Sequence, residues 1–349
     1  AAAALLKQYG VKKYYQKLPK HIEEICQVAY GGGRVEMFKY GHTDAQDNLI
    51  YHYDIIGAYP SVMPLLPSLV GGKWVHDTTN YGNVNMLTSD EISFDDFTLY
   101  RVYWDYRDSL YEGGIYPFFY RQPWNQPRIF YSEQGYSWVA GPELKAAHKW
   151  VHKLGGELHV LESWQFVPAT DEKPFAFVEE LYKLRMKYKA EGNGAQLALK
   201  LAINALYGKM AQTVGYQKET EDQEEKFPPF YNLFYALLIT SFTRAKMFDA
   251  MMQEPESIIA CATDGIWSLK PLKLNISKKG EEKLGEWEHE ELLSFTSVQA
   301  GVYFCTKSDG SPMYHYRGFN QGSIQEDAII KEWANLGYTY AANTRRFAT

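Results

Sequence analysis

The stretch that decides the fold is residues 49–63, which read LIYHYDIIGAYPSVM. Over its first half the side chains alternate between two faces, so a half-buried strand is predicted that ends near Asp54. Gly57 interrupts this alternation, and Pro60 suits the first turn of a helix, where its missing N–H is not needed. The stretch therefore predicts a strand, a carboxylate, a tight turn and a helix. Taken alone, it fits a solvated or capping Asp54 better than a catalytic one.

A second carboxylate, Asp264, lies between two apolar runs that predict strands over residues 257–262 and 266–269. The turn then falls on Thr263-Asp264-Gly265, because an Asp-Gly pair between such runs is a strong hairpin signal. Turn propensity alone explains an Asp at this position equally well. A functional interpretation therefore needs both carboxylates, each held on a rigid β element.

The composition, with 46% hydrophobic and 22% charged residues, indicates a folded soluble protein. The length of 349 residues is enough for two or three subdomains. No run of about eighteen apolar residues and no signal peptide is found, so no membrane span is expected. Cys26, Cys261 and Cys305 are far apart and form no C-x-x-C pair. Neither a zinc site nor a disulfide framework is suggested, and a reducing, cytoplasmic compartment is the simpler expectation.

Basic residues concentrate in one region, although the net charge is −6. Tyrosine is also abundant, with 28 residues, and its flat ring can stack on nucleic-acid bases. A tyrosine-rich core would explain that enrichment equally well. Between residues 183 and 209 the single acid Glu191 is set against six basic residues, which are Lys183, Arg185, Lys187, Lys189, Lys200 and Lys209.

Two helices joined by a short glycine turn are predicted over residues 172–188 and 195–212. At about 100° per residue, Lys200, Asn204 and Tyr207 share one sector of the second helix and form a polar ridge. Apolar walls are expected on both flanks of this ridge, made of Leu199, Ile203, Leu206 and Met210 on one side and Leu197, Leu201 and Ala205 on the other.

The remaining segments mix short strands and helices, so an α/β or α+β fold is predicted. A glycine run, Gly31 to Gly33, precedes Arg34 and could approach a phosphate, although a plain loop is the simpler interpretation. Residues 283–290, with His289 among acids, are expected to form a surface cluster rather than a metal site. Helices are expected over residues 5–28, 142–148, 234–252 and 319–349, strands over 97–106, 128–131, 158–166, 301–306 and 313–317, and an acidic loop over 219–225.

Two carboxylates on rigid elements and a basic helix pair suit one kind of chemistry. Carboxylates that share two divalent ions about 4 Å apart clamp the attacking and leaving oxygens of an in-line phosphoryl transfer. Mg²⁺ suits such a site, because it takes its other ligands from phosphates and water. Lys200, Arg185 and Lys189 would supply the positive charge that the transferred group needs.

Three motifs in this order resemble the polymerase signatures of family B DNA polymerases: Asp54-x4-Tyr59-Pro60-Ser61, Lys200-x3-Asn204-x2-Tyr207-Gly208 and Thr263-Asp264-Gly265. The chain is most similar to the protein-primed subgroup of phage, plasmid and adenoviral enzymes. Tyr30-x-Gly32-Gly33 and Leu284-Gly285-x-Trp287-x-His289-Glu290 resemble further segments of that subgroup. The resemblance covers roughly residues 28–320.

The resemblance implies a right-hand polymerase with an antiparallel-sheet palm, two-helix fingers and a small thumb. The implied boundaries are an N-terminal helical segment over 1–29, a palm over 30–170 and 213–318, fingers over 171–212 and a thumb over 319–349. The few residues before Tyr30 cannot hold a proofreading exonuclease, so such a domain is expected to be absent, on another chain or outside this sequence.

The resemblance also implies roles for individual residues. Asp54 and Asp264 would be catalytic and would bind two Mg²⁺ ions, or Mn²⁺ instead, with the Ile55 carbonyl as a further ligand. The remaining implied roles are triphosphate binding by Arg185, Lys189 and Lys200, sugar selection by Tyr59, the base-pair pocket by Asn204 and Tyr207, the primer end by Tyr303, and DNA contacts by Gly32, Gly33 and Arg34.

The expected function is template-directed DNA synthesis on a 3′-hydroxyl, with DNA template, primer and deoxynucleoside triphosphates as partners, and a terminal protein or other replication subunits as further candidates. The sequence departs from the family pattern in the third signature, where Ala262 replaces an Asp and Gly265 a Ser, and at Gly301, which replaces a Lys. These departures leave two alternatives open, a catalytically weakened nucleic-acid-binding or scaffold subunit and a primer-independent or protein-primed polymerase. The expected location is the cytoplasm, of a host if the chain is viral or plasmid-encoded.

Overall fold

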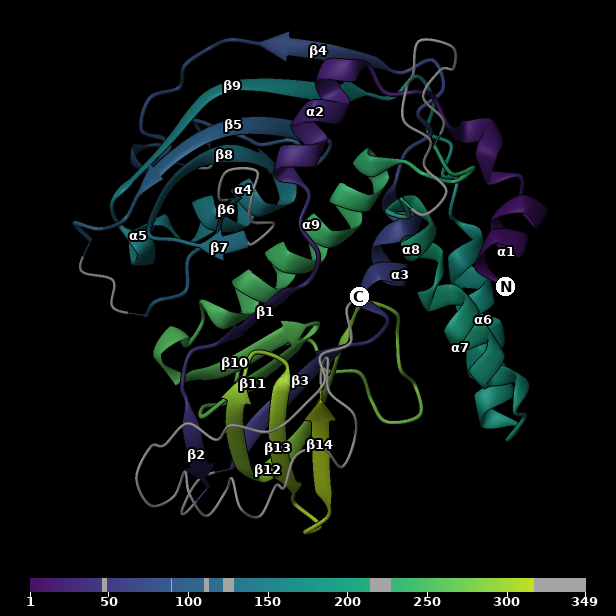
Figure 1. The fold of residues 1–349 in the computed structure, drawn as a ribbon, viewed down its shortest axis with the longest axis vertical. Helices are drawn as coiled ribbons and strands as arrows, with labels where there is room; N and C mark the ends of the chain where they lie inside the picture. The colour runs from purple at the N-terminus through teal and green to yellow at the C-terminus, as the bar shows by residue number, and fades with distance from the viewer. Residues whose placement is uncertain (46–48, 89, 110–112, 122–128, 214–226, 317–349) are drawn as a thin grey trace. The chain divides into compact units, whose positions relative to one another are not determined.

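The computed structural model describes residues 1–45, 49–88, 90–109, 113–121, 129–213 and 227–316 (Figure 1). It divides into two compact units, which are treated separately below. Unit 1 contains Ala1–Gly32, Ile56–Asp249 and Lys279–Gly285. Unit 2 contains Gly33–Ile55, Ala250–Lys278 and the part of Glu286–Thr349 that the structure describes. The predicted acidic loop and thumb lie outside the described residues.

Unit 2 is built on one antiparallel sheet with the strand order β1-β10-β11-β3-β12-β13-β14, and β2 pairs beside β12. A cluster of buried apolar side chains, which includes Ile50, Trp267 and Phe295, forms its core. The bounds are β1 Arg34–Met37, β2 Gly41–Asp44, β3 Ile50–Ile55, β10 Ile258–Thr263, β11 Gly265–Ser268, β12 Trp287–Gln299, β13 Val302–Lys307 and β14 Pro312–Tyr316, with a 3₁₀ turn, η4, at Pro255–Ser257.

Strand β3 confirms the prediction for the first half of residues 49–63 and lies between β11 and β12 in the sheet (Figure 1). Both edges of the strand are paired, and its side chains are buried on both faces: Ile50 belongs to the apolar cluster, and Tyr53 and Ile55 are buried on the opposite face. The Tyr53 hydroxyl accepts a hydrogen bond from Leu272 N at 3.0 Å. Asp54 is therefore held on a strand that is paired on both sides.

Unit 1 combines helices with a four-stranded antiparallel sheet in the order β4-β9-β5-β8 and the hairpin β6-β7. The strands are β4 Lys73–Asp77, β5 Thr98–Asp105, β6 Phe119–Arg121, β7 Ile129–Tyr131, β8 Gln134–Ala140 and β9 Glu157–Val167. The helices are α1 Ala2–Gln8, α2 Lys20–Ala29, α3 Ala58–Val62, α4 Gly141–Lys149, α5 Val151–Leu154, α6 Phe177–Ala190, α7 Ala195–Asn204, α8 Leu206–Met210 and α9 Leu233–Met251, with 3₁₀ turns η1 Val11–Tyr14, η2 Met63–Leu65 and η3 Val84–Met86.

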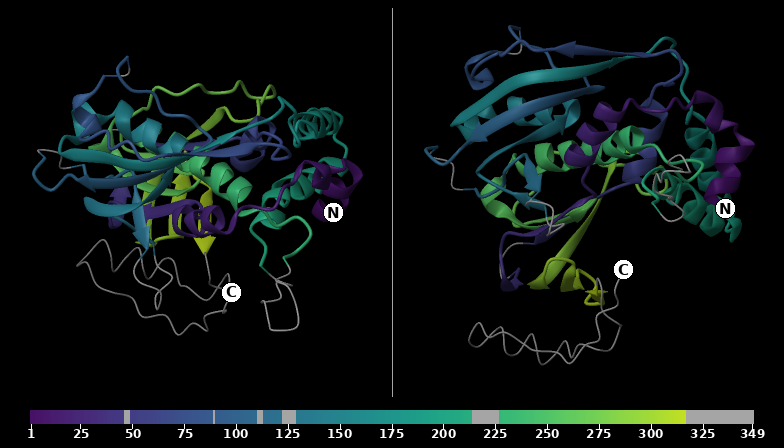
Figure 2. Two further views of the ribbon diagram at one scale, coloured as in Figure 1. Left: turned by 90° about the horizontal axis from the view of Figure 1, so that it is seen from above. Right: turned by 45° about the horizontal axis from the view of Figure 1, so that its top comes forward.

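Helix α9 confirms the helix predicted over residues 234–252 and runs through the core of unit 1 (Figure 2). Near its start the Phe234 ring packs on Trp74 of β4 and Phe166 of β9, at ring-centroid distances of 4.9 and 5.8 Å. Near its end Asp249 accepts a 2.7 Å hydrogen bond from the Trp150 indole N–H. None of the helices in the described residues is both long enough and apolar enough to cross a membrane.

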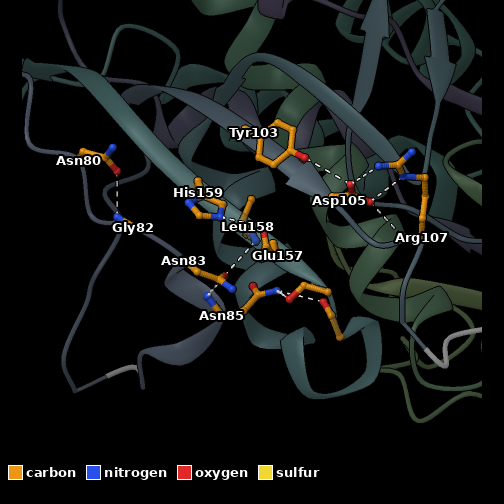
Figure 3. Close-up of polar contacts among 12 residues, drawn as sticks. Asn80, Gly82, Asn83, Asn85, Tyr103, Asp105, Arg107, Glu157, Leu158 and His159 are labelled. Atoms are coloured by element: carbon orange, nitrogen blue, oxygen red, sulfur yellow. Dashed lines mark hydrogen bonds and ion pairs between the residues drawn. The ribbon is translucent and has the colours of Figure 1, made fainter.

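Side-chain amides fix one end of the four-stranded sheet (Figure 3). The side-chain oxygen of Asn83, Oδ1, accepts hydrogen bonds from Leu158 N at 3.1 Å and from Asn85 N at 3.2 Å. At the neighbouring strand end, both Asp105 carboxylate oxygens bind the Arg107 guanidinium, at 3.0 and 2.6 Å. These contacts hold the strand ends in place, and none of the residues in them belongs to the predicted site.

All three cysteines lie within the described residues and are buried free thiols. Cys26 is on α2 in unit 1, and Cys261 and Cys305 are on β10 and β13 in unit 2. Burial raises the pKa of Cys261 to about 12, and burial also raises the pKa values of the other two thiols.

The left-handed turn before α3 depends on glycine. Gly57 has φ 57°, and a Cβ added to it would lie 2.7 Å from Leu284 Cδ1. Gly57→Ala is therefore expected to lower the free energy of unfolding by about 1 kcal/mol beyond the cost of the left-handed backbone itself, because the end of the Leu284 side chain must move away from the added Cβ.

Gly10→Ala is the matched control for chemical denaturation, because Gly10 has φ 61° but nothing within 4 Å of an added Cβ. Equal losses of stability in the two variants would contradict the steric contribution of Leu284.

Candidate functional site

The structure brings the two predicted carboxylates onto neighbouring strands of unit 2. Asp54 on β3 pairs in register with Gly265 on β11, and Ile55 N donates a 3.0 Å hydrogen bond to the Asp264 carbonyl oxygen. A Cβ built on Gly265 would lie 3.5 Å from Asp54 Oδ1. The Asp54 carboxylate is thus placed over the residue that follows Asp264.

The hairpin that carries Asp264 is confirmed, but its turn differs from the predicted one. Ala262 pairs with Gly265, so Gly265 begins β11 and the loop consists of Thr263 and Asp264. Asp264 N donates a 2.7 Å hydrogen bond to Ala262 O, and Thr263 has φ 61°. A left-handed β-branched residue is strained, and such strain is found mainly at functional sites.

The surroundings of Asp264 disfavour the ionised form of its carboxyl group, and a nearby cation would stabilise that form. Burial raises the pKa of Asp264, and the charge of Glu288 on β12 raises it further, while His52 acts in the opposite direction. Glu288 pairs in register with Asp54. Burial also raises the pKa of the Tyr303 hydroxyl, and the charges of both aspartates add to this effect.

A row of paired charges on β3, β12 and β13 was missed by the sequence analysis. Glu290 binds His52 Nδ1 at 3.2 Å and Lys307 Nζ at 3.0 Å, and the pKa of Glu290 falls to about 2 because of these partners, His52 foremost. Glu288 and His289 are exposed, as the predicted surface cluster requires, but they lie on β12, a strand that was not predicted. The acidic residues of this segment interrupt the alternation of apolar and polar side chains from which a strand is predicted.

The donor set at the two aspartates suits a cation that brings other ligands with it. Among the described residues, no group of three His, Cys, Asp or Glu side chains could hold a metal ion as a closed cage. Mg²⁺ binds through one or two carboxylates and fills its remaining positions with water and substrate phosphates. Asp54 and Asp264 therefore fit Mg²⁺, whereas a structural zinc site would need more protein ligands.

Three tyrosines meet in unit 1. The Tyr30 and Tyr207 hydroxyls are 2.6 Å apart, and the ring centroids of Tyr59 and Tyr207 are separated by 4.5 Å. Burial raises the pKa of Tyr207, and Tyr30 adds to the effect. Two of the predicted nucleotide-binding residues, Tyr59 and Tyr207, are thus brought into contact, together with the tyrosine of the glycine run.

The polar ridge predicted for the second helix is wrong in one respect. The helix is divided at Ala205 into α7 and α8, so Tyr207 no longer follows the angular spacing of Lys200 and Asn204. Those two side chains are exposed, whereas Tyr207 turns inward to Tyr30. One predicted apolar wall also faces solvent, with Leu197 and Leu201 exposed at 57% and 72%.

The cations of α6 differ in their partners. Lys189 Nζ lies 2.8 Å from Glu282 Oε1. Arg185 Nε is buried and has no hydrogen-bond partner in the described structure. Arg185 therefore retains a donor that a ligand could use.

A buried ion pair holds the glycine run in unit 1. Arg244 on α9 binds both carboxylate oxygens of Glu143 at 2.9 and 2.8 Å, and its third nitrogen donates to the carbonyls of Gly31 and Gly32. Burial acts to lower the pKa of Arg244, but the Glu143 carboxylate more than offsets this and the pKa lies above its ordinary value. No sequence motif pointed to this pair.

Gly33 and Arg34 belong to unit 2, where Arg34 begins β1 instead of extending the glycine loop. Arg34 is only 1% exposed, its Nε binds the Glu36 carboxylate, and its backbone pairs with Thr263. A phosphate contact from Arg34 stays a prediction that requires this ion pair to open.

Residues 2–233, well over half of the chain, match the family described as DNA polymerase type B, organellar and viral. The chain belongs to this family. The matched part contains the first two of the three motifs that resemble polymerase signatures, including Asp54 and Lys200, and ends before the Asp264 hairpin. Members of the family generally use divalent metal ions.

A DNA polymerase from Acidianus bottle-shaped virus (isolate Italy/Pozzuoli) is 26% identical to this chain over 158 residues, which are 45% of this chain and 21% of the relative. Phi29 DNA polymerase in an orthorhombic crystal form has the same fold, with a TM-score of 0.63, 17% identity and coverage of 95% of this chain and 61% of that chain. Its ternary complex with primer-template DNA and incoming nucleotide gives a TM-score of 0.62 at 18% identity, over 96% of this chain and 61% of that chain. The chain thus spans about a fifth of the viral relative and about three fifths of phi29 polymerase, and the likeness confirms the right-hand polymerase fold.

Removing the charge of Glu143 would leave the Arg244 guanidinium buried without compensation. Glu143→Gln is therefore expected to lower the free energy of unfolding by about 3–5 kcal/mol. The measurement is chemical denaturation followed by circular dichroism.

Glu162→Gln is the control, because it makes the same chemical change in a pair with Arg101 that is partly exposed to solvent. Its expected cost is about 1 kcal/mol or less. A similar loss in both variants would contradict the special role of the buried pair.

Proposed function

We propose that this chain is a template-directed DNA polymerase that adds deoxynucleotides to a 3′-hydroxyl by nucleotidyl transfer. The observation that carries the proposal is the placement of Asp54 and Asp264 on adjacent strands, β3 and β11 with its turn. Membership of the type B polymerase family supports the reaction class. In this proposal residues 30–170 and 213–318 form the palm and residues 171–212 form the fingers.

Asp54 and Asp264 would hold two divalent ions, Mg²⁺ or in its place Mn²⁺, with the Ile55 carbonyl as a further ligand. When bound, such ions neutralise the charge that develops on the attacking and leaving oxygens of an in-line transfer. The raised pKa of Asp264 supports this role, because a buried carboxylate beside Glu288 gains most from a cation.

The other predicted residues would bind and orient the substrates. Arg185, Lys189 and Lys200 would bind the triphosphate, since positioning and charge neutralisation carry most of phosphoryl-transfer catalysis. Tyr59 would lie under the deoxyribose and exclude a 2′-hydroxyl. Asn204 and Tyr207 would line the base-pair pocket, Tyr303 would contact the primer end, and Gly32, Gly33 and Arg34 would contact DNA.

The proposed partners are a DNA template, a primer and deoxynucleoside triphosphates. Phi29 DNA polymerase has been solved with single-stranded DNA and with primer-template DNA, which supports this set. A terminal protein or other replication subunits are further proposed partners. The proposed place of action is the host cytoplasm or nucleoid, if the chain is encoded by a virus or a plasmid.

A second candidate is synthesis that starts without a DNA primer. The observation that favours it is Gly301, where the resembling family has a lysine at the primer grip. The carbonyl of Gly301 is instead bound to His315 Nδ1 at 2.9 Å. Labelled product from template and nucleotide without primer would favour this candidate.

Asp54→Ala and Asp264→Ala are each expected to reduce primer extension by about 10³-fold or more, because each removes a ligand of the ions that stabilise the transferring phosphate. DNA binding, measured by fluorescence anisotropy, should be retained. Asp44→Ala removes an exposed carboxylate from the same sheet and is the control for a general loss of negative charge. Primer extension by either test variant at the wild-type rate would rule the proposal out.

Tyr59→Ala is expected to increase ribonucleotide incorporation relative to deoxynucleotide incorporation by about tenfold or more, because it removes the ring that would clash with a 2′-hydroxyl. The ratio of kcat/KM values for matched ribonucleotide and deoxynucleotide triphosphates measures this. Tyr59→Phe keeps the ring and should preserve sugar discrimination, so a relaxed Tyr59→Phe variant would point to the hydroxyl instead.

A further inference from the structure

Residues Lys279–Gly285, here called the strap, return to unit 1 after the chain has passed through unit 2. The strap is fixed at its end beside the turn that precedes α3. Gly285 N donates a 2.8 Å hydrogen bond to Ile56 O, and Lys246 Nζ donates to the Gly285 carbonyl. Leu284 packs directly against Gly57. This end of the strap is therefore held by backbone and apolar contacts.

The middle of the strap contacts α6 through Glu282. Its Oε1 accepts a hydrogen bond from Lys189 Nζ at 2.8 Å, and its carbonyl accepts one from the Tyr182 hydroxyl at 3.3 Å. Tyr182, Arg185 and Lys189 are spaced by three and four residues and so share one face of the helix. A carboxylate thus lies against the basic face of α6.

The polar groups at this contact are incompletely satisfied. Glu282 Oε2 and Arg185 Nε are both buried, and neither has a hydrogen-bond partner in the described structure. A single carboxylate has two oxygens, whereas a triphosphate presents many and carries more charge, so it can satisfy both cations at once. The α6 face thus carries two cations, Arg185 and Lys189, against the single carboxylate of Glu282.

We propose that Glu282 is an internal stand-in for the triphosphate, which occupies Lys189 in the nucleotide-free chain and is displaced when a nucleoside triphosphate binds. This inference rests on the proposed polymerase function. Glu282 then sets the affinity for the nucleotide by competition. Its displacement also releases the strap from α6 while Leu284 and Gly285 stay fixed at the turn before α3.

The test is binding of a fluorescent deoxynucleoside triphosphate to the full chain, with Ca²⁺ in place of Mg²⁺ so that no transfer occurs. Glu282→Gln is expected to lower Kd by about two- to fivefold, because it removes a competitor whose ion pair is partly exposed. Glu282→Ala should act in the same direction. Glu281→Gln removes the same charge from the neighbouring exposed position and should leave Kd unchanged.

A second variant at Lys189 tests whether Glu282 competes with the nucleotide for this lysine or instead helps the nucleotide to bind. In a Lys189→Met background the Glu282→Gln effect should disappear, since the contested cation is gone. A raised Kd for Glu282→Gln, an equal effect of Glu281→Gln, or an undiminished effect in the Lys189→Met background would each overturn the inference. Failure of the proposed function looks different, because the unmodified chain would then neither bind the nucleotide nor extend a primer.

Discussion

The backbone pairing of β3 on both edges is the constraint on which the carboxylate site depends. Its register with β11 sets Asp54 against Gly265, and its register with β12 sets the same residue against Glu288. A slip of one residue in either ladder would turn Asp54 to the opposite face of the sheet. The apolar residues of the strand favour that register, because Ile50 packs in the apolar cluster on the face that carries Asp54, while Tyr53 and Ile55 are buried on the opposite face.

The two units differ in what surrounds a buried charged side chain. In unit 1, Arg244 is fully satisfied by Glu143 and by the carbonyls of the glycine run, so it holds a loop rigidly and is closed to ligands. In unit 2, Asp264 is buried beside a like charge. The ion pair of Arg244 stabilises a defined loop. The like charges of Asp264 and Glu288 repel each other, and a bound cation would offset that repulsion.

The sequence predicted those parts of the fold that local patterns determine. Strand β3, the Asp264 hairpin and helix α9 follow from alternation, turn residues and a long apolar run. It did not predict β12, since the acids Glu288 and Glu290 interrupt the apolar pattern and are explained only by their partners on β3 and β13. The Arg244 and Glu143 pair was equally invisible, because no local spacing links residues so far apart.

The three buried thiols can report when the part of the structure around each of them opens. A cysteine reacts as the thiolate, and burial disfavours that form at Cys26, Cys261 and Cys305. Alkylating reagents at neutral pH therefore modify the protein only when a structural element opens. Since one thiol lies in unit 1 and two lie in unit 2, mapping which of them is labelled first distinguishes breathing of one unit from breathing of the other.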